Sequence, residues 1–155
     1  MKAAVYTKTK AGKILELLEV DTPTPKDNEV LIKVHAASAN PLDWRLKAAR
    51  PGVDVAGEVI AVGRRVTRYK PGDAVFGAGK GAFAEYACAP ESALATKPQN
   101  LSFERAASIP VAGLTALQGL RDIGKLKPGQ KILINGAAGA SEHLLFKLRS
   151  RWVQR

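Results

Sequence analysis

Short apolar stretches broken by proline and glycine fill the first hundred residues. Val30, Ile32 and Val34 are separated by single residues of mixed character, so an extended chain would have one apolar face there. The apolar run 53–62 contains Gly57, whose missing side chain suits a bulge or a close backbone approach inside a strand. Helix signals are scarce in this part. The pattern predicts a compact, mostly antiparallel β domain.

Two turns with the same chemistry punctuate the chain. Residues 70–73 read Lys-Pro-Gly-Asp, and residues 127–130 read Lys-Pro-Gly-Gln. Proline at the second position and glycine at the third are typical of a type II turn. A shared turn type does not make an internal repeat, and the sequence shows no periodic self-similarity.

Helical patterns begin at Ser102, which can cap a helix over 103–108 that ends at Pro110. A second helix is predicted over Val111–Asp122, with Gly124 placed to end it in a left-handed conformation. We therefore place a domain boundary near residue 100. Residues 1–100 are predicted to form one domain, and residues 101–155 to open a second, α/β domain.

A short apolar run and a turn of small residues follow. Residues 132–134 read Ile-Leu-Ile, as expected for a strand over Lys131–Asn135 that is buried on both faces of a parallel sheet. The turn contains Asn135, Gly136, Ala137 and Gly139, and a helix-compatible segment comes after it. Strand, glycine-rich turn and helix are the context in which backbone N–H groups bind the pyrophosphate of a dinucleotide.

The match to the dinucleotide pattern G-x-G-x-x-G is partial. Gly136 and Gly139 fit, but Glu142 stands where a third small residue is expected. A tight strand-to-helix turn without a ligand is the alternative. A second strand, with a residue that recognises the ribose about 20 residues after the turn, does not follow before residue 155.

Composition narrows the class of protein. The 155 residues are 46% hydrophobic and 25% charged, as in a globular protein, and no apolar run is long enough to cross a bilayer. With no secretion signal at the start, we predict a cytoplasmic protein.

The single cysteine, Cys88, excludes an internal disulfide and a thiolate-rich zinc site, and it is predicted to be a half-buried strand residue. His35 is predicted to be a packed or solvent-edge histidine rather than a metal ligand.

The net charge of +10 leans toward the C-terminus, where residues 101–155 carry 9 basic and 3 acidic side chains. A basic tail can attract phosphates, but residues 147–155 offer few aromatic partners, so a solvated charged face is the simpler interpretation. The apolar stripe over residues 144–152 is predicted to face a core rather than a membrane surface. We predict no nucleic-acid and no membrane partner.

Several ordered segments together resemble the medium-chain dehydrogenase/reductase superfamily, in particular its zinc-free quinone oxidoreductase type. They are residues 1–5, 25–34, 39–44, 51–57, 70–77, 81–86, 113–117 and 134–139. The resemblance implies a mainly β GroES-like domain followed by the truncated start of an α/β Rossmann domain. It also implies NADP or NAD as the cofactor and hydride transfer to a quinone or an electron-poor C=C bond. The cofactor carries that chemistry, and the protein supplies orientation and electrostatics.

The same resemblance assigns roles to residues. Asn40 and Asp43 would line the nicotinamide and substrate pocket, and Asn40 would hydrogen-bond the substrate oxygen where charge gathers. Thr115, Asn135, Gly136, Ala137 and Gly139 would contact the cofactor. Zinc-dependent relatives place a cysteine where this chain has Asn40 and a His-Glu pair at residues 53–54, so no zinc is expected. The alternatives are a turn at Asn40 and Asp43 and a hydrogen bond of Thr115 within its own helix.

Two departures from the family pattern lead to a second hypothesis. The stretch 46–50 is shorter than the usual loop, and from Ala140 onward the family's Gly-Val-Gly is replaced by Ser-Glu-His and a basic tail, as in a truncated or frameshifted reading frame. We therefore expect an incomplete and inactive reductase. The alternative function is a non-catalytic GroES-like interaction module that forms homo-oligomers through the open sheet edge at Lys131–Asn135.

Overall fold

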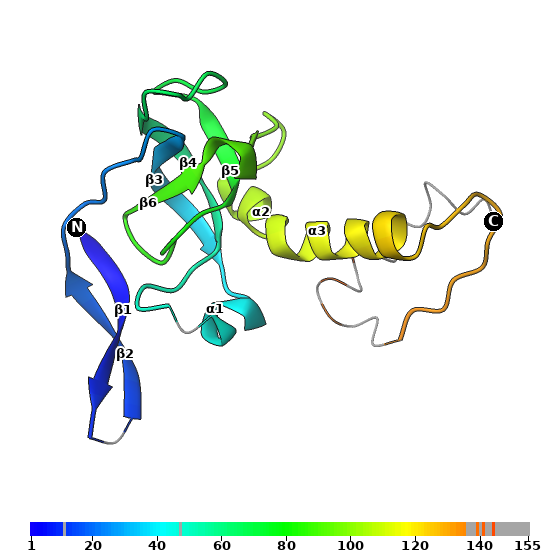
Figure 1. Ribbon diagram of the computed structural model, residues 1–155, viewed down its shortest axis with the longest axis horizontal. Helices are drawn as coiled ribbons and strands as arrows, with labels where there is room; N and C mark the ends of the chain where they lie inside the picture. Colours follow the sequence, from blue (N-terminus) through cyan, green and yellow to red (C-terminus); the bar gives the residue numbers. More distant parts are fainter. Residues whose placement is uncertain (11, 47, 136–138, 140, 142–143, 145–155) are drawn as a thin grey trace. The chain divides into compact units, whose positions relative to one another are not determined.

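The computed structural model describes residues 1–10, 12–46, 48–135, 139, 141 and 144 (Figure 1). The chain divides into two compact units, Met1–Ser108 and Ile109–Arg155.

A five-stranded antiparallel sheet forms the centre of the first unit. Its strand order is β6-β3-β4-β5-β7, so the long strands β3 and β4 lie in the middle. The strands are β3 (Glu29–Ser38), β4 (Asp54–Val62), β5 (Ala74–Ala78), β6 (Tyr86–Pro90) and β7 (Leu94–Thr96), with a 3-10 turn η1 (Glu91–Ala93) before the last strand. The mainly β character predicted for this part of the chain is confirmed.

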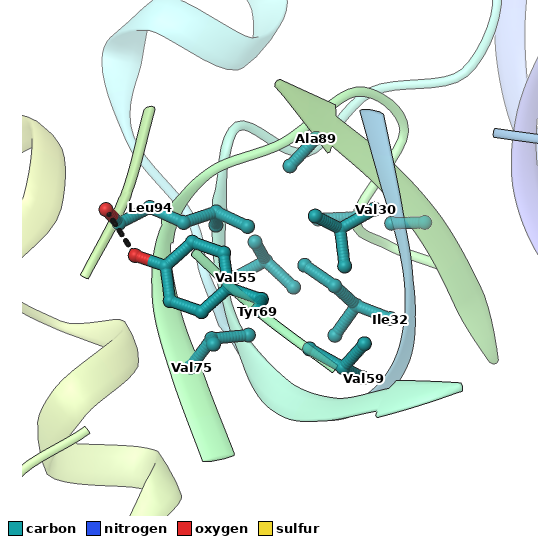
Figure 2. Packing of buried hydrophobic residues seen from close by; sticks show 10 residues of the cluster. Val30, Ile32, Val55, Val59, Tyr69, Val75, Ala89 and Leu94 are labelled. Atoms are coloured by element: carbon teal, nitrogen blue, oxygen red, sulfur yellow. Dashed lines mark hydrogen bonds between the residues drawn. The ribbon is translucent and has the colours of Figure 1, made fainter. Parts of the chain in front are cut away.

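The core of this sheet consists of aliphatic side chains around one tyrosine (Figure 2). Val30 and Ile32 are fully buried and Lys33 is exposed, as the alternation predicts, but Leu31 is buried as well. Leu31 pairs in register with Cys88 of β6, which is buried too, so both faces of β3 are buried at its start. The hydroxyl of Tyr69 donates to the carbonyl of Leu94 at 2.7 Å, which satisfies its polar group inside the core.

Gly57 lies in β4, close against the backbone of β3. It pairs with Val34, next to a register shift between Val34 and Ala36. A Cβ at Gly57 would overlap the carbonyl oxygen of Lys33, so a close backbone approach explains the glycine, as the sequence predicts. Gly72 has φ +92, as the type II turn over 70–73 requires.

A β-hairpin precedes the sheet. Strands β1 (Lys2–Thr9) and β2 (Gly12–Glu19) pair over their full lengths, and Ala3 of β1 bridges to Ala84. All eight residues of β2 are exposed. Its large aliphatic side chains lie on both faces of the strand, with exposed fractions of 43% for Ile14, 50% for Leu15, 70% for Leu17 and 36% for Leu18.

Helix α2 (Phe103–Ala107) completes the first unit. The Ser102 hydroxyl accepts a hydrogen bond from the backbone N–H of Arg105 at 3.3 Å, which confirms the predicted cap. The helix packs on β3, β4 and β5 through its alanines, and for this reason the compact unit continues to Ser108 instead of ending near residue 100. The His35 ring stacks on Phe103 with a centroid separation of 4.4 Å, so His35 has a packing role.

The second unit begins with α3 (Pro110–Gln118), which continues into a π-helical turn, η2 (Gly119–Ile123). The prediction of a left-handed Gly124 is wrong, because Gly124 has φ −73 and Lys125, at φ +45, is the left-handed residue. Close approach explains the glycine instead, since a Cβ there would lie 2.8 Å from the carbonyl oxygen of Gly119.

The predicted buried strand over Lys131–Asn135 is also wrong. Residues 131–134 have no strand assignment, and Leu133 is 94% exposed. A parallel strand needs neighbouring strands for its hydrogen bonds, and no described segment of the second unit is a strand. The oligomer contact predicted at this edge therefore has no strand to start from within the described residues. Most of the predicted helix after the glycine turn lies outside them.

Candidate functional site

Three polar side chains meet where β3 ends and β4 begins. Asp54, the first residue of β4, is fully buried and pairs in register with Ser38, the last residue of β3. One of its carboxylate oxygens, Oδ2, accepts from the Ser38 hydroxyl at 2.9 Å and from Nδ2 of Asn40 at 2.9 Å. The Asn40 amide also lies 3.3 Å from the Ser38 hydroxyl and 3.4 Å from the Ser38 carbonyl. These bonds fix the orientation of the half-buried Asn40 side chain.

Asp43 connects this cluster to the next turn. It lies in the short helix α1 (Pro41–Arg45) and is 6% exposed. Its Oδ2 accepts from the backbone N–H of Asn40 at 2.6 Å, and its Oδ1 accepts from the backbone N–H of Val53 at 3.0 Å. With both oxygens in use, the carboxylate holds the start of α1 against the turn before β4.

A cavity of about 130 Å³ lies beside Asp43. Its lining residues come from the end of α1, the turn before β4 and the segment after β5: Asp43, Leu46, Ala48, Arg50, Pro51, Gly52, Val53, Gly79, Lys80 and Gly81. Backbone hydrogen bonds fix these walls, with Gly79 N–H donating to the Val53 carbonyl at 2.7 Å and Ala82 N–H to the Gly52 carbonyl at 3.0 Å. Asp43, predicted as a pocket residue, lines this cavity. Asn40 does not line the cavity, but its backbone N–H donates to Asp43.

The predicted cofactor residues lie in the second unit. Thr115 is exposed, and its hydroxyl donates to the Val111 carbonyl at 2.7 Å, a bond within its own helix. Asn135 is exposed, Gly136 and Ala137 lie outside the described residues, and Gly139 is half-buried. No strand precedes the turn in the described part, so the described residues by themselves do not form the strand–turn–helix arrangement that binds a pyrophosphate.

Ionisable groups near the cavity have shifted pKa values. Burial raises the pKa of the Cys88 thiol, which keeps it protonated and unsuited to act as a nucleophile. The hydrogen bond from Lys80, at 2.9 Å, lowers the pKa of the buried Glu29 carboxyl. No group of three or more His, Cys, Asp or Glu side chains within the described residues is arranged to hold a metal ion. The expected absence of zinc stays a prediction.

Sequence reasoning missed the contributions of Ser38 and Asp54. The available signal was an aspartate at the start of an otherwise apolar strand, because a buried carboxylate must have hydrogen-bond partners nearby. Arg50 and Lys80 were also missed, since they approach the cavity from segments far apart in the sequence.

Comparison with known proteins finds relatives for the whole first unit. Residues 26–99 match the alcohol dehydrogenase GroES-like domain family. A chloroplast envelope quinone oxidoreductase homolog from Arabidopsis thaliana is 40% identical, over 86% of this chain and 47% of that protein. A 2-methylene-furan-3-one reductase from Solanum lycopersicum is 37% identical, over 96% of this chain and 44% of that protein.

Solved structures extend the likeness to the fold. A quinone oxidoreductase from Coxiella burnetii has a TM-score of 0.86 and 34% identity, over 99% of this chain and 55% of that chain. A mycobacterial protein solved with NADPH has a TM-score of 0.88 and 29% identity, over 99% of this chain and 51% of that chain.

The first unit thus contains a GroES-like domain of the alcohol dehydrogenase kind. In sequence and in fold, the chain resembles the quinone oxidoreductase type of the medium-chain dehydrogenase/reductase superfamily. It spans about half the length of the relatives that it matches, 47% in the Arabidopsis protein. Within the described residues, no helix is both long and apolar enough to cross a membrane.

Proposed function

We propose that this chain carries the acceptor-binding part of an NAD(P)H-dependent reductase, which transfers hydride to a quinone or to an electron-poor C=C bond next to a carbonyl. The observation that carries the proposal is the arrangement around Asp43. Its carboxylate ties the Asn40 turn to Val53, and a cavity opens beside it. The names of the relatives, quinone oxidoreductase and furanone reductase, and the NADPH held by a structural neighbour support the reaction and the cofactor.

The chain's own residues would hold and polarise the acceptor. One hydrogen of the Asn40 amide is committed to Asp54 at 2.9 Å, while the contacts to Ser38 are longer. The second hydrogen is therefore the one that an acceptor oxygen can compete for, and such a donor stabilises charge that develops on the oxygen. Asp43, with both oxygens in use, is proposed as a positioning residue. A nicotinamide, when bound, supplies the hydride.

We propose that the chain by itself turns over slowly or not at all. The described residues of the second unit do not form the strand–turn–helix that binds a pyrophosphate, so Thr115, Asn135, Gly136, Ala137 and Gly139 remain only proposed cofactor contacts. NADPH or NADH as the hydride donor, a cytoplasmic location and the absence of nucleic-acid and membrane partners are part of the same proposal. Three of the relatives are named as chloroplast proteins.

The test measures both NADPH binding and NADPH oxidation. NADPH is titrated into the full chain while tryptophan fluorescence is recorded, and NADPH oxidation is then followed with a quinone present. We expect weak binding and little turnover from the chain alone. We expect turnover from a chimera that joins residues 1–124 to the nucleotide-binding half of the Coxiella relative. Asn40→Ala should lower the turnover of the chimera about 10-fold or more, whereas the exposed Asn100→Ala should not. A chimera that binds NADPH but reduces no quinone or enone would contradict the proposal.

A second candidate function is interaction rather than catalysis. The exposed aliphatic side chains on both faces of β2 favour it, because such a strand is normally covered. Sedimentation of the chain and of Leu17→Lys distinguishes the two. A homo-oligomer that Leu17→Lys dissociates would support the interaction module, and a monomer in both cases would leave the reductase as the better account.

A further inference from the structure

The cavity beside Asp43 has the size of a single ring. Its volume is about 130 Å³, and an apolar protein cavity of about 150 Å³ holds one benzene molecule. Leucine, alanine, proline, valine and glycine make up most of its lining. A ligand that fills it is therefore mainly apolar and about one six-membered ring across.

Arg50 supplies the donor at this cavity. Its side chain runs along Gly81, because a Cβ placed on Gly81 would lie 3.1 Å from Cβ and 3.9 Å from Nε of Arg50. Both residues line the cavity. Within the described part of the chain, no hydrogen bond or ion pair engages the Arg50 guanidinium. Its donors are thus available to an oxygen atom that enters the cavity.

The charges around the cavity balance. The cations Arg50 and Lys80 stand against the carboxylates of Asp43, which lines the cavity, and Glu29, which Lys80 contacts at 2.9 Å. Carboxylate repulsion offsets much of the attraction that the cations would exert on an anion. A neutral ligand with a polarised carbonyl gains the Arg50 hydrogen bond without that repulsion.

We propose that Arg50 is a specificity-determining residue of this site, and that the site takes a neutral, single-ring acceptor whose carbonyl oxygen binds the Arg50 guanidinium. This rests on the proposed reductase function for the statement that the ligand is the acceptor. Larger acceptors with fused rings exceed the cavity volume of about 130 Å³ and are disfavoured, and ring acids are disfavoured by Asp43 and Glu29.

The test measures binding without cofactor. The ¹⁵N-labelled full chain is titrated with cyclohex-2-enone, cyclohexene, benzoate and 1,4-naphthoquinone, and amide shifts of Val53, Gly79 and Gly81 are followed. Cyclohex-2-enone should shift these amides saturably, and naphthoquinone should not. Arg50→Gln should weaken enone binding about 5-fold or more, because a hydrogen bond from a charged donor is lost, and should leave cyclohexene unchanged. Arg65→Gln, another exposed arginine, is the matched control.

A second variant checks the size limit. Ala48 lines the cavity and is exposed, so Ala48→Leu should fold and should reduce the binding of both the enone and cyclohexene. The proposal is overturned if benzoate binds more tightly than the enone, if naphthoquinone shifts the same amides, or if Arg50→Gln leaves enone binding intact. If the enone shifts these amides but the chimera transfers no hydride to a quinone or an enone, the site stands and the proposed function is removed. If the chimera turns over but the enone shifts none of these amides, the proposed function stands and the site is removed.

Discussion

Replacement of Asp43 by asparagine tests how the candidate site is held together. The carboxylate accepts two backbone N–H groups, from Asn40 at 2.6 Å and from Val53 at 3.0 Å, and it is 6% exposed. Asparagine keeps one acceptor oxygen but turns an NH₂ group toward the other N–H donor. One charge-assisted bond is then lost and the other becomes a bond to a neutral group. Because such bonds contribute about 1.5–3 kcal/mol each, Asp43→Asn should lower the free energy of unfolding by about 2–4 kcal/mol.

Urea unfolding followed by far-UV circular dichroism measures this loss as a lower midpoint. The matched control is Asp27→Asn, which removes an exposed ion pair with Arg64 and should cost less than about 1 kcal/mol. Equal midpoints for wild type and Asp43→Asn would refute the reasoning, because two buried carboxylate bonds would then contribute nothing. In the chimera, Asp43→Asn should also lower turnover without changing its pH profile, since Asp43 positions neighbours and moves no proton.

Other outcomes follow from single contacts. The Lys80 hydrogen bond lowers the pKa of Glu29, so the ionised Glu29 should stabilise the fold fully at neutral pH. This stabilisation should be lost as the pH falls through the folded-state pKa. Glu29→Gln should therefore flatten the acid side of a stability–pH curve. Gly57→Ala should cost about 1–3 kcal/mol or more in thermal unfolding, because the new Cβ would overlap the Lys33 carbonyl oxygen. Since burial raises the pKa of the Cys88 thiol, alkylation by iodoacetamide should be slow until urea unfolds the chain; rapid labelling of the folded chain would contradict the structure.

Local patterns predicted the first unit well. The alternation around Val30 and Ile32, the close approach at Gly57 and the turn at Gly72 each depend on neighbours or on the residue's own backbone, and each is confirmed. The burial of Leu31 was not predictable from the alternation, because its neighbours in the sheet, such as Cys88 of β6, come more than fifty positions later. The strand predicted in the second unit was wrong for the same physical reason. The apolar run at Leu133 forms a strand only where neighbouring strands can hydrogen-bond to it.

The candidate site was predicted in part. Asn40 and Asp43 were proposed from a motif, and the structure brings them into one hydrogen-bond network. Asp54, which accepts from the Asn40 amide, was noticed only as a position where zinc-binding relatives differ, and its bond to Ser38 depends on strand register. Arg50 carries no motif at all. Which cation reaches a cavity is decided by how loops pack, and periodicity contains no information on that.

The aliphatic side chains exposed on both faces of β2 have a practical consequence for handling the chain. Sulfate is excluded from protein surfaces and raises the free energy of apolar groups left in water. Salting out with ammonium sulfate should therefore occur early for this chain, and phenyl resin should retain it strongly. Replacement of Leu15 and Leu17 by threonine, which keeps the preference for an extended strand, should raise the sulfate concentration needed for precipitation and shorten the retention on phenyl resin.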